Sequence, residues 1–223
     1  MMTGMGKKTI EEMFDELLTS GVIDSPGRLS FSLAKIDINV NSKDVVGGVL
    51  QEWLGHWMQS RHYDVTSPAN SQAFPDFYLN EFDMLECKSF AYGKKPGFDV
   101  AAYSSYIESL NSIPSRLDAS YIVFGYTLEN GIVFIKNIWL KKVWQLTGPS
   151  VTNLLELQVK RQYPQNIRPK NFPINPQACF ASRLEFCEKL HMSAIRFKPI
   201  RGHSEGWLEN LKINYREYSG QDL

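Results

Sequence analysis

The spacing of hydrophobic and polar residues predicts two helices near the start of the chain. Residues 8–20 place hydrophobic side chains three and four positions apart, at Ile10, Met13, Phe14, Leu17 and Leu18. Thr9 and Glu12 have the spacing of a reciprocal capping box at the N-terminus of this helix, and Gly21 ends it. A second helix is predicted over residues 43–59, where Trp53 and Trp57 belong to a broad apolar face.

The pattern then changes to the two-residue alternation of strands. Residues 29–40 are expected to be extended. Residues 74–79 and 83–90 predict a hairpin with a polar turn at Asn80-Glu81. A second hairpin is predicted further along, with strands at 119–128 and 131–140 around the turn Glu129-Asn130-Gly131.

Helices and loops complete the pattern. Asp99 is expected to cap a helix that reaches residue 112. Beyond the second hairpin the sequence predicts a short helix, a strand, a proline-punctuated loop and two helices, at residues 141–147, 154–161, 158–172, 176–192 and 203–218. The order of elements predicts an α/β (α+β) fold in which helices flank a central mixed β-sheet.

Composition is that of a globular protein that can bury one sizeable core. The chain has 223 residues, of which 43% are hydrophobic and 13% aromatic. It has no run of about 18 apolar residues and no secretory signal pattern, so we expect no membrane association and a cytoplasmic location. Cys87, Cys179 and Cys187 are widely spaced, which favours reduced thiols over disulfides or a metal site.

The predicted hairpin at 74–90 carries the charges that indicate chemistry. Asp76 lies on its first arm, and Glu86 and Lys88 lie two residues apart on its second arm. Alternation places the Glu86 and Lys88 side chains on one face, and the intervening Cys87 on the other. Two carboxylates and an ammonium group are therefore expected at one site.

This set of residue types suits hydrolysis of a phosphodiester bond. Mg²⁺ prefers one or two carboxylate ligands together with water and phosphate oxygens, which Asp76 and Glu86 can provide. Lys88 offers three donors for a water molecule or a phosphate oxygen. By chance alone, a Pro-Asp pair followed by an acid, any residue and Lys occurs in roughly one chain in ten of this length. The strand-forming residues around both parts make the catalytic interpretation stronger than a structural one.

The residues Pro75-Asp76 and Glu86-Cys87-Lys88 resemble the signature of the PD-(D/E)XK nucleases, and more narrowly of the type II restriction endonucleases. The resemblance covers roughly residues 44–171. It implies sequence-specific, Mg²⁺-dependent cleavage of double-stranded DNA, with Mn²⁺ able to substitute. It also implies a homodimer, a cognate DNA methyltransferase in the same system, and Glu52 on the preceding helix as an auxiliary acid and metal ligand.

Under this resemblance, residues 1–223 form a single nuclease domain, with a catalytic core at 44–140 and a DNA-recognition and helical part at 141–223. Residues 1–138 carry 11 Lys and Arg against 17 Asp and Glu, a net charge of −6, whereas residues 139–223 carry 13 against 7, or +6. The C-terminal part is therefore expected to supply much of the phosphate contact. The candidates for DNA contact are Lys94, Lys95, Lys160, Arg161, Gln162, Asn166, Arg168, Lys170 and Asn171.

Two alternatives stay open at this point. A repair or junction-resolving nuclease of the same superfamily would carry the same signature, and a non-catalytic DNA-binding module could use the acid pair structurally. The four histidines, His56, His62, His191 and His203, lack a metal-binding context and are expected in packing or surface roles. The Gln-Glu-Trp helix and the Arg-Pro loop resemble enzymes that read GGNNCC-like interrupted palindromes.

Overall fold

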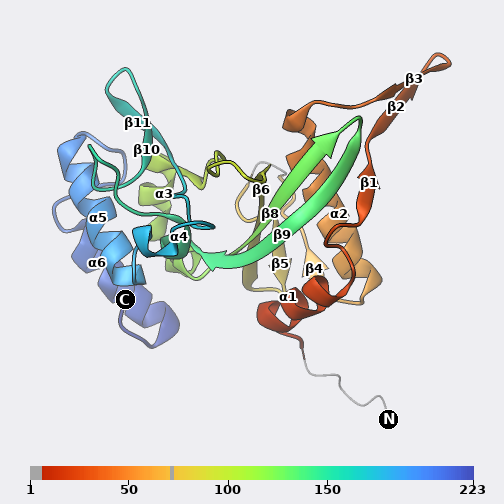
Figure 1. Ribbon diagram of the computed structural model, residues 1–223. Helices are drawn as coiled ribbons and strands as arrows, with labels where there is room; N and C mark the ends of the chain where they lie inside the picture. Colours follow the sequence, from red (N-terminus) through yellow and green to blue (C-terminus); the bar gives the residue numbers. More distant parts are fainter. Residues whose placement is uncertain (1–6, 71–72) are drawn as a thin grey trace, which may run out of the picture. The chain divides into compact units, whose positions relative to one another are not determined.

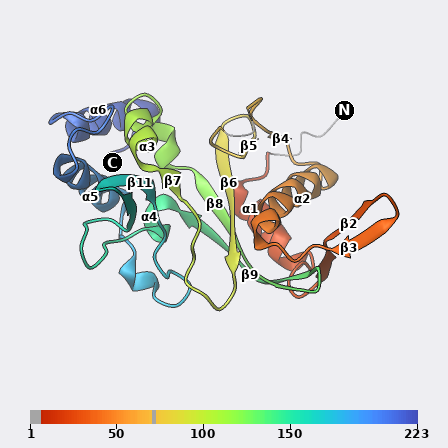
Figure 2. The same ribbon diagram turned by 90° about the horizontal axis from the view of Figure 1, so that it is seen from above.

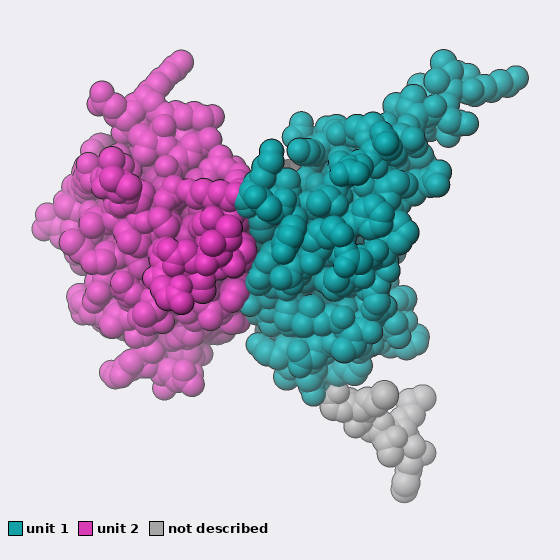
Figure 3. All heavy atoms as spheres, viewed as in Figure 1, with its two compact units in different colours: residues 1–94, 120–140 teal, residues 95–119, 141–223 magenta. Residues whose placement is uncertain are grey.

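The computed structural model describes residues 7–70 and 73–223 and divides the chain into two compact units (Figure 3). Unit 1 consists of Met1–Lys94 and Ser120–Leu140, and unit 2 consists of Lys95–Ala119 and Lys141–Leu223. Residues 95–119, within the predicted core at 44–140, thus group with the C-terminal residues. The division of a single nuclease domain into a catalytic core at 44–140 and a C-terminal part at 141–223 stays a prediction.

The two helices of unit 1 lie where the hydrophobic spacing predicted them. They are α1 (Ile10–Thr19) and α2 (Val46–Ser60), with a 3₁₀ turn at Lys43–Val45 before α2. The capping box is confirmed, because Thr9 Oγ1 accepts from the backbone N of Glu12 at 3.1 Å and Glu12 Oε2 accepts from the backbone N of Thr9 at 2.7 Å. Leu18, one of the hydrophobic residues whose spacing predicted this helix, is exposed.

A six-stranded mixed sheet forms the body of unit 1 and confirms the predicted fold class (Figure 1). In spatial order its strands are β1 (Pro26–Arg28), β9 (Ile132–Lys142), β8 (Ser120–Glu129), β6 (Asp83–Ala91), β5 (Phe77–Leu79) and β4 (Val65–Thr66). β6 runs antiparallel to β5 and parallel to β8. The central position of β6 buries the strand that carries Glu86 and Lys88.

The core of unit 1 lies between this sheet and the two helices. Met13 and Leu17 from α1 and Leu54 and Met58 from α2 are fully buried, in one cluster with alternate residues of the strands, such as Leu85. Full burial of one such side chain stabilises the fold by about 1.5–3 kcal/mol. α2 lies along the sheet in both ribbon views (Figure 2).

The stretch predicted as extended, 29–40, forms a separate two-stranded hairpin of β2 (Ser30–Leu33) and β3 (Ile36–Asn39). Ala34 and Lys35 at its tip both have positive φ, as a two-residue hairpin turn of this kind requires. Figures 1 and 2 show the hairpin extending away from the rest of unit 1.

Unit 2 is mainly helical, with one small sheet. Its helices are α3 (Tyr103–Leu110), α4 (Val143–Leu146), α5 (Arg183–Arg196) and α6 (Trp207–Ser219), with 3₁₀ turns at Pro114–Leu117 and Pro176–Ala178. Its strands are β10 (Leu157–Lys160), β11 (Tyr163–Ile167) and β7 (Ala101–Ala102), in that spatial order. Trp207 is buried at the start of α6, and its Nε1 donates to the backbone O of Ile107 at 3.1 Å. This bond ties α6 to α3.

Several predicted boundaries were wrong, including those of the helix predicted at 176–192, which begins at Arg183 and ends at Arg196 as α5. Asp99 does not cap α3, whose N-cap is Ala102, because Ala101–Ala102 first pairs with β11. The predicted loop at 158–172 contains β11, which forms a hairpin with β10. β5 begins at Phe77 and not at residue 74, since Pro75 has no N–H for a ladder.

The remaining expectations concern cysteines and membrane spans. Cys87, Cys179 and Cys187 are free thiols, as predicted, and Cys87 and Cys187 are buried among core residues. In the part of the chain that the structure describes, no helix is both long and apolar enough to cross a membrane.

Candidate active site

The three residues of the signature meet at the junction of β5 and β6. Asp76 directly precedes β5, and the pairing of Phe77 with Leu85 brings it opposite Glu86. Asp76 Oδ2 accepts from the backbone N of Cys87 at 2.8 Å, and Glu86 Oε2 accepts from the backbone N of Asp76 at 3.1 Å. Lys88 Nζ lies 2.7 Å from Glu86 Oε1. The Glu86 carboxylate thus contacts both the backbone of Asp76 and the side chain of Lys88. Alternation along β6 predicts that Glu86 and Lys88 share a face.

Burial controls the electrostatics of this site. Glu86 is only 7% exposed, and the side chain of Lys88 is 22% exposed. Burial raises the pKa of Asp76, although the N–H of Cys87 and the charge of Lys88 oppose the rise. Burial also raises the pKa of Glu86, and the neighbouring Asp76 adds to the effect while Lys88 opposes it. Burial and the proximity of the two acids therefore disfavour two carboxylate charges at this site.

Lys88 stays an ammonium in this setting. Burial opposes its charge, but the charges of Glu86 and Asp76 and the hydrogen bond to Glu86 outweigh burial, so the pKa of Lys88 is raised. Two carboxylates facing one ammonium leave a net negative charge when all three are ionised.

The donor atoms fit a hard divalent cation. Within the described residues, Asp76 Oδ1 makes no hydrogen bond, while Oδ2 is fixed by the backbone of Cys87. Glu86 presents a second carboxylate held in place by two contacts. Oxygen ligands of this type suit Mg²⁺ or Mn²⁺. The described residues contain no group of three His, Cys, Asp or Glu side chains arranged to hold a metal, so the candidate ligands that lie together here are these two acids.

Glu52 is not brought into this set. Glu86 and Lys88 project from one face of the sheet, and α2 packs on the other face. A Cβ on Gly47 of α2 would lie 3.4 Å from Ser89 Oγ, and the side chain of Ser89 points away from the face of Lys88 because the two residues are adjacent on β6. Glu52 is exposed and lines a pocket of about 340 Å³ together with Phe77 and Gln51. Its role as an auxiliary acid stays a prediction from the sequence.

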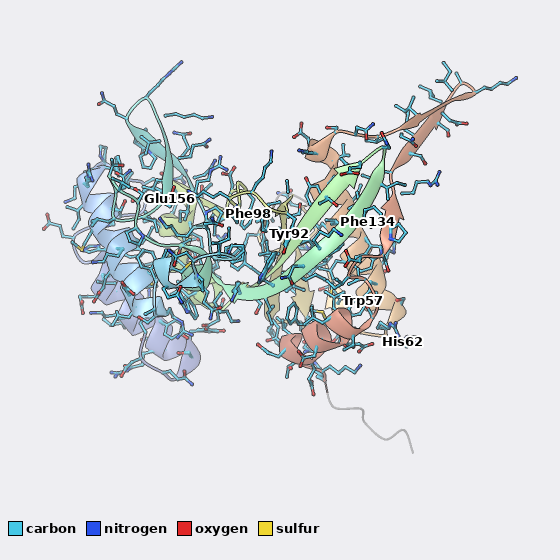
Figure 4. The ribbon with its side chains drawn as sticks, in the orientation of Figure 1. Trp57, His62, Tyr92, Phe98, Phe134 and Glu156 are labelled. Carbon is cyan, nitrogen blue, oxygen red and sulfur yellow. The ribbon has the colours of Figure 1, made fainter. Side chains whose placement is uncertain are left out.

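Most of the predicted DNA-contacting cations of unit 2 are engaged in ion pairs. Glu156, labelled in Figure 4, accepts from Lys95 at 2.8 Å and from Lys170 at 3.2 Å. Arg168 Nε pairs with Asp99 Oδ1 at 3.0 Å, and its Nη1 donates to the backbone O of Gly97. These pairs link the segment before α3 to the strands β10 and β11. The sequence analysis missed Glu156, because its partners are distant in the chain and no local motif marks them.

The other candidate DNA-contacting residues differ in their exposure and in their hydrogen bonds. Lys160, Arg161 and Gln162 are exposed at the tip of the β10–β11 hairpin, where Arg161 and Gln162 both have positive φ. Asn166 donates from its amide to Gln158 Oε1 at 3.0 Å. The remaining two candidates are Lys94, which is exposed, and Asn171, whose side-chain oxygen is buried without a hydrogen bond among the described residues.

Two of the histidines pack together in unit 2. The rings of His191 and His203 are in contact, with Nε2 of His203 3.0 Å from Nδ1 of His191, and His191 stacks on Trp207. Burial lowers the pKa of both. This arrangement agrees with the predicted packing role.

Comparison with known proteins agrees with the geometry. A family model described as NgoBV restriction endonuclease matches residues 7–223. The type II restriction enzyme NlaIV of Neisseria lactamica is 34% identical over 233 residues, covering 98% of this chain and 94% of that protein. The type II restriction enzyme NgoBV of Neisseria gonorrhoeae is 40% identical over 150 residues, covering 64% of this chain and 85% of that protein.

The solved structure of the NlaIV restriction endonuclease superposes with a TM-score of 0.89 at 34% identity, covering 97% of this chain and 92% of that one. The resemblance stated from the sequence is thereby confirmed at the level of enzyme class and fold. The chain belongs to the NgoBV restriction endonuclease family and is a type II restriction endonuclease, a site-specific deoxyribonuclease.

Proposed function

We propose that this enzyme hydrolyses double-stranded DNA with Mg²⁺ held by Asp76 and Glu86, and that Lys88 acts beside them on the scissile phosphate. Type II restriction endonucleases act on double-stranded DNA and generally use divalent metal ions. The observation that carries the proposal is the contact chain from the backbone of Asp76 through Glu86 to Lys88 Nζ. Mn²⁺ is expected to substitute, because it takes the same oxygen ligands.

Each side chain has a separate task in this proposal. Glu86 fixes Lys88 through Oε1, and the ammonium group retains two further donors for a water molecule or a non-bridging phosphate oxygen. Asp76 is oriented by the N–H of Cys87 and keeps Oδ1 for a ligand. When bound, the metal ion would supply Lewis-acid stabilisation of the charge that develops on the phosphate. Glu52 remains the proposed auxiliary acid on sequence grounds alone.

For recognition we propose the tip of the β10–β11 hairpin. Lys160, Arg161 and Gln162 are exposed there, whereas Lys95, Arg168 and Lys170 each pair with a carboxylate of unit 2. A two-stranded ribbon fits the major groove, where Arg pairs with guanine and Gln with adenine. The paired cations link the residues beside this hairpin to the segment before α3 and remain proposed phosphate contacts.

Symmetry of the substrate supports a homodimer. A palindromic site is read most simply by two identical subunits related by a twofold axis, each cutting one strand. A GGNNCC-like site, a cognate methyltransferase that protects the host DNA, and action in the cytoplasm remain expectations of the same proposal.

Digestion of a long plasmid tests the proposed activity. Purified protein with Mg²⁺ is expected to give discrete fragments, and run-off sequencing of their ends gives the site and the stagger together. Asp76→Asn is the matched control for metal-dependent cleavage, since an amide oxygen can still accept from the N–H of Cys87. Cleavage that persists in EDTA, or that occurs only on branched or mismatched DNA, would contradict the proposal. The latter result would support the repair-nuclease alternative.

A further inference from the structure

The β2–β3 hairpin has an apolar face that nothing in its own unit covers. Phe31 lies directly opposite Ile38, and Leu33 lies opposite Ile36. Because directly paired residues and residues two apart project from the same face, these four side chains form one surface. They are 53%, 51%, 66% and 67% exposed in the order named. This surface is called the arm face below.

The opposite face of the hairpin is polar. It carries Ser30, Ser32, Asp37 and Asn39, and Ser32 Oγ donates to Asp37 Oδ1. An isolated two-stranded hairpin is at best marginally stable in water and normally needs further packing on its apolar face. The separation of apolar and polar faces therefore indicates that the arm face packs against another surface.

The β2–β3 hairpin is called the arm, and the residues that join it to the sheet are called its root. Hydrogen bonds hold the root in place, so the arm has a defined direction. Leu29 N donates to the backbone O of Gly131 at 2.7 Å, and Gly131 N donates to Asn41 Oδ1 at 2.9 Å. Gly131 has φ +74°, and a Cβ there would lie 2.7 Å from the backbone O of Leu29. The root can therefore pack this closely against the turn between β8 and β9 only because residue 131 is glycine.

A complementary groove lies on the same unit, next to the root. It has a volume of about 510 Å³, and its apolar lining includes Leu29, Val49, Trp53, Trp57, Val133 and Ile135. Trp53 and Trp57 stack with their ring centroids 6.5 Å apart, and Trp57 is labelled in Figure 4. Val49 is 40% exposed. The arm of the same chain leaves this groove open while it exposes its own apolar face.

We propose that the arm face docks in the groove of a second copy of this chain, and that the exchange is reciprocal. This inference rests on the proposed function insofar as a palindromic cleavage requires two subunits. The exchange would be isologous, because each subunit contributes both an arm and a groove and a twofold axis satisfies both at once.

Area and charge favour this occupant. At about 150–200 Å² per large apolar side chain, the arm face exposes about 400 Å², which is within the range of functional patches. A reciprocal exchange covers two such faces, about 800 Å² of arm surface in the dimer, in addition to the groove surface beneath them. The arm carries only Lys35 and Asp37 as charged residues, so it lacks the basic excess that phosphate contact requires.

The molar mass of the full chain, measured by light scattering across a range of concentrations, tests the proposal. The double variant Leu33→Asp, Ile36→Asp is expected to weaken dimerisation at least about 100-fold, because two charges would be buried without partners. Phe82→Asp is the matched control, since Phe82 is 78% exposed on the β5–β6 turn of the same unit and lies outside both arm and groove. Its mass should equal that of the unsubstituted chain. Thermal melts verify that both variants are folded.

A crosslink tests the geometry directly. Chains with Ile36→Cys and chains with Val49→Cys, both in a Cys179→Ser background because Cys179 is only half-buried, are expected to form a disulfide on mixing. Each chain alone should not. A monomeric parent chain, a dimer that survives the arm substitutions, or arm variants that stay dimeric but lose DNA binding would each overturn the proposal. The last outcome would assign the arm to DNA.

These readouts are independent of cleavage. Lys88→Ala is expected to remain dimeric, because Lys88 lies on β6 in contact with Glu86. An inactive parent protein whose dimer is dispersed by the arm substitutions would contradict the proposed function and leave the arm inference standing.

Discussion

At the scale of single residues, removing the ammonium group of Lys88 is the most specific test of the proposed chemistry. Lys88→Ala removes one donor from the transition state, worth about 3 kcal/mol, so we expect at least a 100-fold loss of single-turnover cleavage with DNA binding retained. Lys136→Ala is the control, because Lys136 is an exposed lysine of unit 1 that pairs with Asp24. Unchanged turnover in Lys88→Ala would remove Lys88 from the proposed mechanism.

The acids at the site predict how metal binding depends on pH. Protons and the metal ion compete for the same oxygens. Since burial raises the pKa of Asp76 and of Glu86, competition begins at a higher pH than for ordinary carboxylates. The increase in Tm caused by Mg²⁺ relative to EDTA is therefore expected to be largest at neutral to alkaline pH and to shrink as the pH falls.

Without metal, the two acids should make the protein less stable as the pH rises, which is opposite to the pH dependence of the Mg²⁺ effect. A carboxyl group whose folded-state pKa is raised contributes stability that is fully present below its unfolded-state pKa and is lost as the pH rises through the folded-state value. In EDTA, the contribution of Asp76 and Glu86 to the free energy of unfolding thus falls from acidic towards neutral pH. Asp76→Asn should weaken this fall and abolish the Mg²⁺ effect. Parallel melts of both proteins across pH check both statements, and an equal Mg²⁺ effect in Asp76→Asn would contradict the ligand assignment.

At the scale of elements, the hairpin of β10 and β11 predicts separable effects on DNA binding and folding. Arg161→Ala at its exposed tip is expected to weaken specific binding by about 1–3 kcal/mol per half-site and to relax the choice of base at one position in each half-site. Stability should change little, because Arg161 is exposed. Binding assays with cognate and single-substituted duplexes measure the effect. Equal weakening on all sequences would instead identify a phosphate contact.

A glycine after α4 predicts a large loss of stability. A Cβ on Gly148 would lie 2.1 Å from the backbone O of Ala178, which cannot move as a flexible side chain can. Gly148→Ala is therefore expected to lower the free energy of unfolding by about 2 kcal/mol or more, as overpacking in well-packed sites does. Gly206→Ala is the control, because a Cβ there meets no atom within 4 Å. Urea denaturation compares the two variants.

The elements also show how far the sequence could predict the structure. The hairpin of β5 and β6 was predictable, because alternation around Glu86 and Lys88 is local. β11 was not, because Pro164 lacks an N–H and argues against a central strand. The structure accommodates it where the register of β10 shifts between Gln158 and Val159. The ion pairs of Glu156 with Lys95 and Lys170 join positions far apart in the chain, so no sequence window reveals them.

At the scale of the whole molecule, the charge is divided between the two units. Unit 1 carries 9 Lys and Arg against 14 Asp and Glu, a net charge of −5, and unit 2 carries 15 against 10, or +5. The acids of unit 1 include the proposed metal ligands, while unit 2 carries the exposed hairpin tip. Unit 2 is thus the expected source of phosphate contacts, and a zero net charge for the whole chain conceals this division.

Salt dependence tests this division of tasks. If unit 2 neutralises Z phosphates, log K for DNA binding falls with log salt concentration at a slope of about −0.9Z. The slope, measured on Lys88→Ala protein so that the DNA stays intact, should become shallower by about 2 when Lys160→Gln is added, because each subunit of the proposed homodimer loses one phosphate contact. Lys212→Gln is the control, because Lys212 on α6 pairs with Glu209 at 2.8 Å. Since the proposed chemistry at Asp76 and Glu86 follows binding, the single-turnover rate at saturating enzyme should change little over the same salt range. A slope that Lys160→Gln leaves unchanged would exclude Lys160 as a phosphate contact.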